Sequence, residues 1–157
     1  MLTSKREFCT LFPEISFPWE IRTTSFDEFE EILFIHTAIC VDTRLVCPLC
    51  NLHCPRYDMR SRRWRHLDTC EYRTIVWGEV PRIKCPEHGC LTIRVPWADP
   101  GRRYTNAFEM YVMECLRETP LHAVSRRLGL SRGAINGIEQ HAMKRMPTEW
   151  WRTQRVG

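Results

Sequence analysis

The chain has 157 residues, of which 43% are hydrophobic, enough for one domain or two small ones. No run approaches the roughly 18 apolar residues that a membrane-spanning helix needs, and the sequence starts without the apolar core of a secretory signal. Nine cysteines, an odd number, argue against a secreted disulfide framework and favour a reducing, cytoplasmic compartment.

The net charge of +4 is unevenly distributed along the chain. Residues 1–46 hold 4 Lys/Arg and 8 Asp/Glu, a net charge of −4, whereas residues 47–157 hold 19 and 11, a net charge of +8. A basic half of this kind is typical of nucleic-acid binding. An arginine-rich soluble surface would give the same composition, so charge alone does not separate the two interpretations.

Residues 1–46 predict an N-terminal β segment. Residues 17–22 read as a short strand, and residues 31–40, which are apolar and rich in β-branched side chains, read as a second strand. The apolar spacing of residues 26–34 also fits a short helix. We expect a small antiparallel sheet in an α+β protein.

Two five-residue segments share one local plan. Residues 47–51 read Cys-Pro-Leu-Cys-Asn and residues 85–89 read Cys-Pro-Glu-His-Gly: ligand, Pro, any residue, ligand, turn residue. Pro sets φ for the turn, and Asn or Gly accepts the left-handed conformation that closes it. Two such knuckles supply the four ligands of a closed, structural Zn²⁺ site. The expected ligands are Cys47, Cys50, Cys85 and His88.

The fourth ligand has an alternative, because Cys90 lies two residues after His88. His88 is favoured because the x-x spacing places both ligands of a knuckle on one turn. Further candidates, whose spacing matches no knuckle, are His53, Cys54 and Cys70.

A zinc-ribbon module is predicted over residues 47–97. Residues 74–77 and 80–83 suggest two strand pieces with Gly78 between them, and residues 91–95 suggest a strand after the second knuckle. The knuckles are joined by an arginine-rich loop, residues 56–66. Its arginines can meet phosphates or a narrow minor groove, or can form a solvated face with Trp64 in the core. The candidate DNA contacts in this loop are Arg62, Arg63 and Arg65.

Residues 98–104 form a basic, turn-rich linker, after which the pattern becomes helical. Thr105 can cap a helix with an apolar stripe at Phe108, Tyr111, Val112, Cys115 and Leu116. Thr119 is the expected N-cap of the next helix, with Pro120 at its first position. A helix-turn-helix domain is predicted over residues 105–147, followed by a tail at residues 148–157.

Residues 121–140 fit a helix-turn-helix position by position. The slots that must be buried are all apolar: Val124, Leu128, Leu130, Ile135 and Ile138. Gly129 occupies the sharp turn, Ser125 stands where two helices cross, and Ser131 caps the second helix. An ordinary helical hairpin with a glycine turn is the competing interpretation.

The second helix would enter the major groove of DNA. Its outward residues Arg132, Asn136 and Gln140 can read bases, because Arg pairs with guanine and Asn or Gln with adenine. Residues better placed for phosphates are Arg126, Arg127, Lys144 and Arg145.

Taken together, these motifs resemble the N-terminal part of insertion-sequence transposases of the ISL-three type. The resemblance rests on residues 47–50, 63–70, 80–89, 95–98 and 123–131, and covers about residues 15 to 145. It implies a zinc finger followed by a helix-turn-helix, both recognising the terminal inverted repeats of a bacterial element as double-stranded DNA. A cytoplasmic, nucleoid-associated protein would follow, and the oligomeric state, a homodimer included, stays open.

Such transposases continue into an RNase H-like catalytic domain with three metal-binding acidic residues, for which this sequence offers no region. We therefore expect the DNA-binding part of a transposase, without strand-transfer activity. Neither a small-molecule substrate nor a membrane is expected as a partner. A free-standing transcriptional regulator, or a competitor of a full transposase, is the alternative function. A zinc-dependent hydrolase is disfavoured, because four protein ligands leave the metal no open position.

Overall fold

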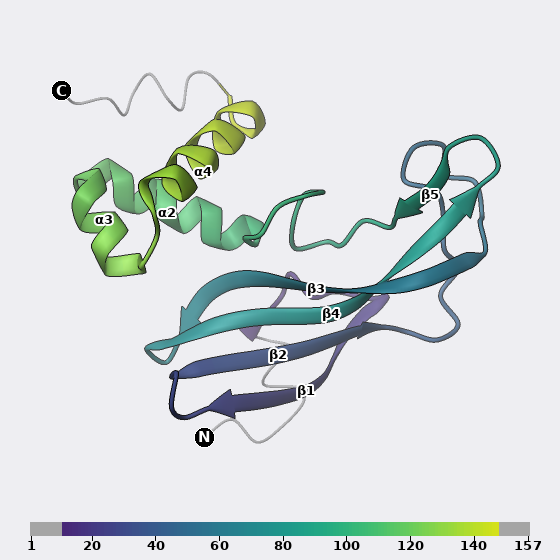
Figure 1. Cartoon of the computed structure of the whole chain (residues 1–157), viewed down its shortest axis with the longest axis horizontal. Coiled ribbons are helices and arrows are strands. Elements are labelled where there is room, and N and C mark those ends of the chain that lie inside the picture. The colour runs from purple at the N-terminus through teal and green to yellow at the C-terminus, as the bar shows by residue number, and fades with distance from the viewer. Residues whose placement is uncertain (1–10, 148–157) are drawn as a thin grey trace. The chain divides into compact units, whose positions relative to one another are not determined.

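A computed structural model describes residues 11–147 of the chain. The residues divide into two compact units between Thr105 and Asn106. We call them the sheet unit, which ends at Thr105, and the helical unit, which starts at Asn106. Together they form an α+β protein with a mixed five-stranded sheet and three described helices (Figure 1). The α+β prediction is therefore confirmed.

The sheet unit is built on five strands: β1 (Trp19–Asp27), β2 (Ile32–Ile39), β3 (Arg56–Thr69), β4 (Tyr72–Cys85) and β5 (Gly89–Thr92). The strand order is β1-β2-β4-β3, and β5 pairs with β4. Three pairings are antiparallel, but β2 and β4 are parallel. The small antiparallel sheet expected within residues 1–46 is confirmed by the β1–β2 pairing. The parallel pairing was not predicted, and it arises because β4 rather than β3 lies beside β2.

Four local predictions about strands are corrected. The arginine-rich segment is not a loop but most of strand β3. Gly78 does not divide two strand pieces, because β4 runs without a break through it for 14 residues. The helical alternative for residues 26–34 is wrong, since β1 ends at Asp27 and β2 begins at Ile32. The strand after the second knuckle covers residues 89–92 rather than 91–95.

One face of the sheet, here called the inner face, carries the core of the sheet unit. Alternate residues of the strands point into it, including Ile35, Trp64 and Val76, which are almost fully buried. Trp97 closes the core by packing edge-on against Trp19 at 5.0 Å and against Trp64 at 5.3 Å between ring centroids. The remaining core residues come from the strands and from the segments on either side of them: Phe12, Ile15, Ile21, Val80 and Ala98.

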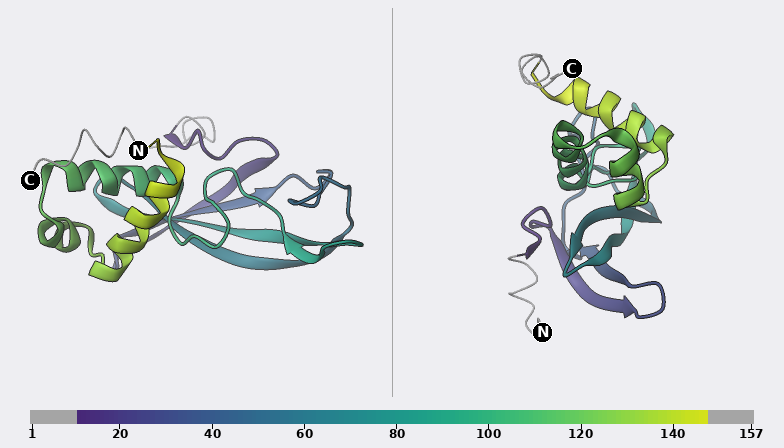
Figure 2. Two further views of the ribbon diagram at one scale, coloured as in Figure 1. Left: turned by 90° about the horizontal axis from the view of Figure 1, so that it is seen from above. Right: turned by 90° about the vertical axis from the view of Figure 1, so that its left-hand side faces the viewer.

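The segment before β1 covers the inner face, so it passes behind the sheet in Figure 1 and to one side of it in the right-hand view of Figure 2.

His66 of β3 contacts Thr105, the last residue of the sheet unit. His66 is buried, and its Nδ1 lies 2.8 Å from Thr105 Oγ1. Burial lowers the pKa of His66, which keeps the ring neutral at pH 7. The face of the sheet opposite to this core is here called the outer face.

The helical unit contains α2 (Asn106–Glu118), α3 (Leu121–Leu128) and α4 (Arg132–Arg145). The five apolar slots of the predicted helix-turn-helix are all buried, with between 0% and 6% of each residue exposed. Gly129 ends α3 with φ 64°, the left-handed conformation that its slot requires. Ser131 caps α4, because its Oγ accepts the Ala134 N–H at 3.1 Å.

Two details of the helical unit go beyond or against the sequence prediction. The N-cap residue of α3 is Pro120 rather than Thr119, so the helix starts one residue later than expected. Ser125 Oγ donates to the Leu130 carbonyl at 2.5 Å, which joins α3 to the turn that follows it.

Over residues 11–147, no helix has the length and apolar character needed to cross a membrane.

Gly78 generates a stability prediction. A Cβ at this position would lie 2.4 Å from Thr37 Oγ1 and 3.2 Å from the Thr37 carbonyl oxygen, across the β2–β4 pairing. Gly78→Ala should therefore destabilise the sheet unit by about 1–3 kcal/mol, measured by denaturant unfolding. The double variant Gly78→Ala/Thr37→Ala should recover part of the loss, because it removes the nearest clashing atom. An unchanged unfolding midpoint in Gly78→Ala would refute this packing.

Candidate metal centre and nucleic-acid interface

The two knuckles adopt the same backbone turn. Asn51 has φ 59° and Gly89 has φ 74°, so both closing residues take the left-handed conformation expected of them. In the first knuckle, the Asn51 N–H donates to the Cys47 carbonyl at 2.9 Å, and the Leu49 N–H points at Cys47 Sγ at 3.5 Å. The second knuckle forms the turn between β4 and β5, where Cys85 pairs with Gly89.

The fold brings together the four side chains that the sequence singled out. The donor atoms of Cys47, Cys50, Cys85 and His88 all lie within 4.8 Å of one another. His88 Nδ1 is 3.5 Å from Cys85 Sγ and 3.7 Å from Cys47 Sγ, and Cys50 Sγ is 3.7 Å from Cys85 Sγ. Ligands held on a tetrahedral Zn²⁺ at usual bond lengths would be separated by roughly 3.5–3.8 Å. The cluster thus has the dimensions of a tetrahedral zinc site, and three thiolates with one imidazole suit this metal.

The protein environment favours thiolates at the two buried cysteines. Burial acts to raise the pKa of Cys47, but hydrogen bonds from the backbone N–H groups of Leu49 and Cys50 and from the Cys50 thiol act to lower it, and the net shift is downward. The pKa of Cys85 is lowered in the same way, with Glu87 and His88 supplying the N–H groups. Metal ligation needs the deprotonated sulfur, so each knuckle prepares its first cysteine for a cation.

The alternative ligands lie elsewhere or are engaged. Cys90 is exposed and sits on β5 opposite Lys84, outside the cluster of four. His53 Nδ1 lies 2.8 Å from the Leu45 carbonyl, and Cys70 is exposed at the β3–β4 turn. Cys54 is buried beside the cluster, where its Sγ donates to the Leu52 carbonyl at 3.3 Å. Burial raises the pKa of the Cys54 thiol, which favours a neutral side chain.

In the helical unit, α4 separates a buried side from an exposed side. Ile135, Ile138 and Ala142 are buried, whereas the predicted base-reading residues Arg132, Asn136 and Gln140 are exposed. Steps of four residues keep Arg132, Asn136 and Gln140 on one face of the helix. Exposed basic residues flank this face at Arg126, Arg127, Lys144 and Arg145. Arg127 Nη2 donates to the Tyr111 hydroxyl at 3.3 Å.

A buried polar pair in the helical unit was missed by the sequence analysis. Glu109 is 2% exposed and its Oε2 lies 2.5 Å from His141 Nδ1, which ties α2 to α4. A buried carboxylate requires such a partner. The only sequence signal was an acidic residue directly after Phe108 in the apolar stripe of α2, and its partner 32 residues away could not be inferred from it.

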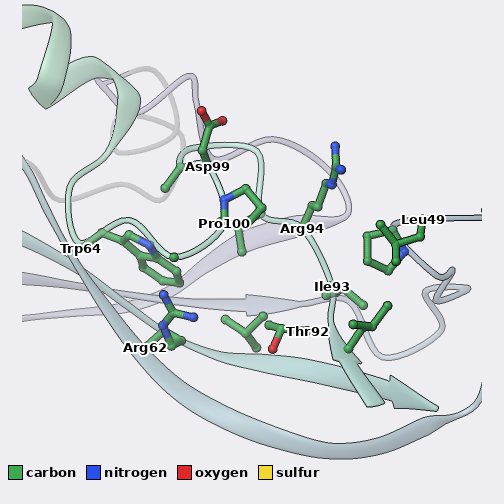
Figure 3. Close-up of a pocket in the computed structure, with 14 residues that line it drawn as sticks. Leu49, Arg62, Trp64, Thr92, Ile93, Arg94, Asp99 and Pro100 are labelled. Carbon is green, nitrogen blue, oxygen red and sulfur yellow. The ribbon is translucent and has the colours of Figure 1, made fainter. Parts of the chain in front are cut away.

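The three arginines of β3 that were predicted to contact DNA have different environments. Arg62 lies over the Trp64 ring at 5.5 Å, beside a pocket of about 350 Å³ next to the first knuckle (Figure 3). Arg63 is exposed on the outer face and lies 5.9 Å from the Phe34 ring centroid. The Arg65 side chain is only 10% exposed, lies 3.8 Å from Asp68, and has a pKa lowered by its burial. Arg65 is therefore the least accessible of the three to a phosphate, and the DNA-contact roles of all three stay predictions.

Comparisons with known proteins match two consecutive segments of the chain. Residues 43–90 match the zinc-finger of transposase IS204/IS1001/IS1096/IS1165, and residues 93–143 match the helix-turn-helix domain of transposase family ISL3. Over 65 residues, 40% of this chain, the sequence is 35% identical to the transposase for insertion sequence element IS1557 from two strains of Mycobacterium tuberculosis. The match spans 15% of the length of those relatives. No solved structure matches the chain.

The metal centre generates a prediction about its fourth ligand. His88→Ala should lose bound zinc and lower the melting temperature of the sheet unit, because binding free energy of the metal is folding free energy. Cys90→Ala should keep both, since Cys90 lies outside the cluster. The measurements are elemental analysis and thermal melting, with Cys47→Ser as the reference for loss of a buried ligand. If His88→Ala retains zinc and Cys90→Ala loses it, the fourth ligand is Cys90 rather than His88.

Proposed function

We propose that this chain, which carries the zinc-ribbon and helix-turn-helix domains of the ISL3 transposase family, binds the terminal inverted repeats of an insertion sequence as double-stranded DNA. The observation that carries the proposal is the two-sided character of α4. Its inward residues are fully buried, its N-terminus is capped by Ser131, and its outward residues are polar and exposed. A capped helix with a free polar face after a left-handed glycine turn suits insertion into the major groove.

In this proposal the metal is structural. One Zn²⁺ per chain, held by Cys47, Cys50, Cys85 and His88, would tie the first knuckle to the β4–β5 turn. All four donors are protein side chains, so the ion would have no open position for a water or a substrate. The metal centre would therefore stabilise the sheet unit. The contacts to DNA would be made by protein side chains rather than by the metal.

The base-reading residues give the specificity prediction. Arg132→Ala and Asn136→Ala should each cost about 1–3 kcal/mol on the preferred site and relax the choice at one base position. Gln140→Ala should cost less, because Gln140 lies farther along the helix. Stability should not change, since none of these side chains is buried. The measurement is binding to a panel of single-base variants of a duplex selected from a random pool.

Arg117→Ala is the charge-matched control, because Arg117 is an exposed basic residue in the last turn of α2. It should leave the preference profile intact. If Arg132→Ala and Asn136→Ala also retain the wild-type profile, α4 does not read the groove. Selection of terminal-repeat sequences supports the transposase function, whereas selection of scattered promoter sites would favour a free-standing regulator.

The flanking arginines give a second prediction about DNA. Arg126→Ala and Arg127→Ala should weaken binding to all duplexes alike and flatten the log–log salt dependence by about 0.9 each, because each phosphate contact releases counterions. Arg65→Ala should instead lower thermal stability, since the Arg65 side chain is largely buried. A lost affinity with an intact salt slope in Arg126→Ala and Arg127→Ala would show that these residues support folding rather than contact DNA.

A further inference from the structure

The outer face of the sheet carries aromatic rings that lie outside the core of the inner face. Neighbouring strands β2 and β4 place Phe34, His36, Ile75 and Trp77 on this face, in the pairs Phe34–Ile75 and His36–Trp77. All four residues are half-buried, as expected for the middle of a sheet whose face is open, and none joins the cluster on the inner face. Figure 1 looks onto this face, because the segment that covers the inner face passes behind the sheet.

The rings on the outer face are held in defined orientations. Trp77 Nε1 donates to Ser61 Oγ at 2.6 Å, and His36 Nε2 lies 2.9 Å from Ser25 Oγ. The His36 and Trp77 rings meet nearly at right angles, with centroids 4.7 Å apart. Strands β1 and β3 thus fix the aromatic side chains of β2 and β4 from both sides. Rings that are already fixed lose little side-chain entropy when a ligand stacks on them.

Cations flank these rings. Arg63 of β3 lies over Phe34 with its guanidinium carbon 5.9 Å from the ring centroid, and Arg73 of β4 is exposed on the same face two positions before Ile75. Within residues 11–147, no ion pair joins Arg63 or Arg73 to a carboxylate. The charge of Arg73 also acts on the neighbouring Arg65, so an anion at this edge would relieve a repulsion between like charges. Glu79 is the carboxylate at the other end of this row of β4, beyond Trp77.

We infer that the outer face, through Phe34, His36 and Trp77 together with Arg63 and Arg73, binds unpaired nucleotides of a nucleic acid strand. Aromatic side chains that interleave with cations suit a single strand, because bases stack on the rings while phosphates meet the arginines. A paired duplex keeps its bases stacked on one another and cannot use such rings. The inference takes its class of partner from the proposed function, but it concerns a different surface from α4 and a different state of the DNA.

The test measures binding of a short fluorescent oligo(dT) strand to the full chain by anisotropy. Trp77→Leu and Phe34→Leu should each weaken binding roughly 5-fold to 150-fold, the range that corresponds to loss of one stacked base. Phe29→Leu is the matched control, since Phe29 is 92% exposed in the β1–β2 turn, outside the strands that carry these rings. It should bind as wild type does. Zinc content and melting temperature establish that each variant is folded.

A substitution of Arg63 tests the inference without disturbing the core, because Arg63 is exposed. Arg63→Gln should lower the log–log salt slope for oligo(dT) by about 0.7, the value for one phosphate of a single strand. Arg44→Gln, an exposed arginine outside the strands, should leave the slope unchanged. An Arg63→Gln variant with wild-type affinity and slope would overturn the inference.

The outcomes for the two DNA surfaces are separable. Arg132→Ala should retain oligo(dT) binding while it loses duplex specificity, and Trp77→Leu should do the reverse. Wild-type protein that binds its selected duplex but not oligo(dT) would overturn the single-strand site and leave the proposed function standing. Equal losses in Phe29→Leu and Phe34→Leu would overturn it as well. Binding of oligo(dT) without any duplex preference would instead count against the role of α4.

Discussion

The meeting of the two knuckles is the constraint on which the sheet unit depends. Cys47 and Cys85 are buried beside Ile83, at 0% and 2% exposure, and the backbone N–H groups of both knuckles favour their thiolates. Two buried negative sulfurs close together would repel each other strongly without a cation. A divalent ion held by the four donors would remove this repulsion and would attach the segment before β3 to the end of β4. The longest strand pair of the sheet would thus be fixed at the end where its hairpin is open.

The helical unit solves a different problem, because α4 must keep one side polar and exposed while it is held firmly. Ile135 and Ile138 supply apolar burial, and the Glu109–His141 pair adds a directional contact between α2 and α4. A buried hydrogen-bonded pair specifies the rotation of one helix against another more sharply than apolar contact alone. Under the proposed function, the orientation of α4 about its own axis decides whether Arg132 and Asn136 reach a groove, so a polar contact on its inward side would support recognition.

What the sequence predicted well is local. Each knuckle is five residues long, and the helix-turn-helix slots all lie within 20 residues. Both patterns can therefore be identified without knowledge of the rest of the fold. Strand β3 was missed because its alternation pairs Trp64 and His66 with arginines on both sides, which reads as a charged loop. Gly78 read as a break because a glycine in a strand often marks one, whereas here the missing side chain makes room for Thr37. The parallel β2–β4 pairing joins residues about 40 positions apart, and no local sequence pattern predicts it.

The same long-range pairing explains what the first 46 residues contribute. They looked like a separate, acidic β segment, yet β1 and β2 lie in one sheet with β4, and they supply both faces of it. On the inner face they provide Trp19, Ile21 and Ile35 to the core around Trp97. On the outer face they provide Phe34 and His36, beside the Trp77 and Arg63 that follow the first knuckle. The division between an acidic start and a basic remainder is therefore a property of the linear sequence. In the folded protein, aromatic rings from the first part and cations from the second form one surface.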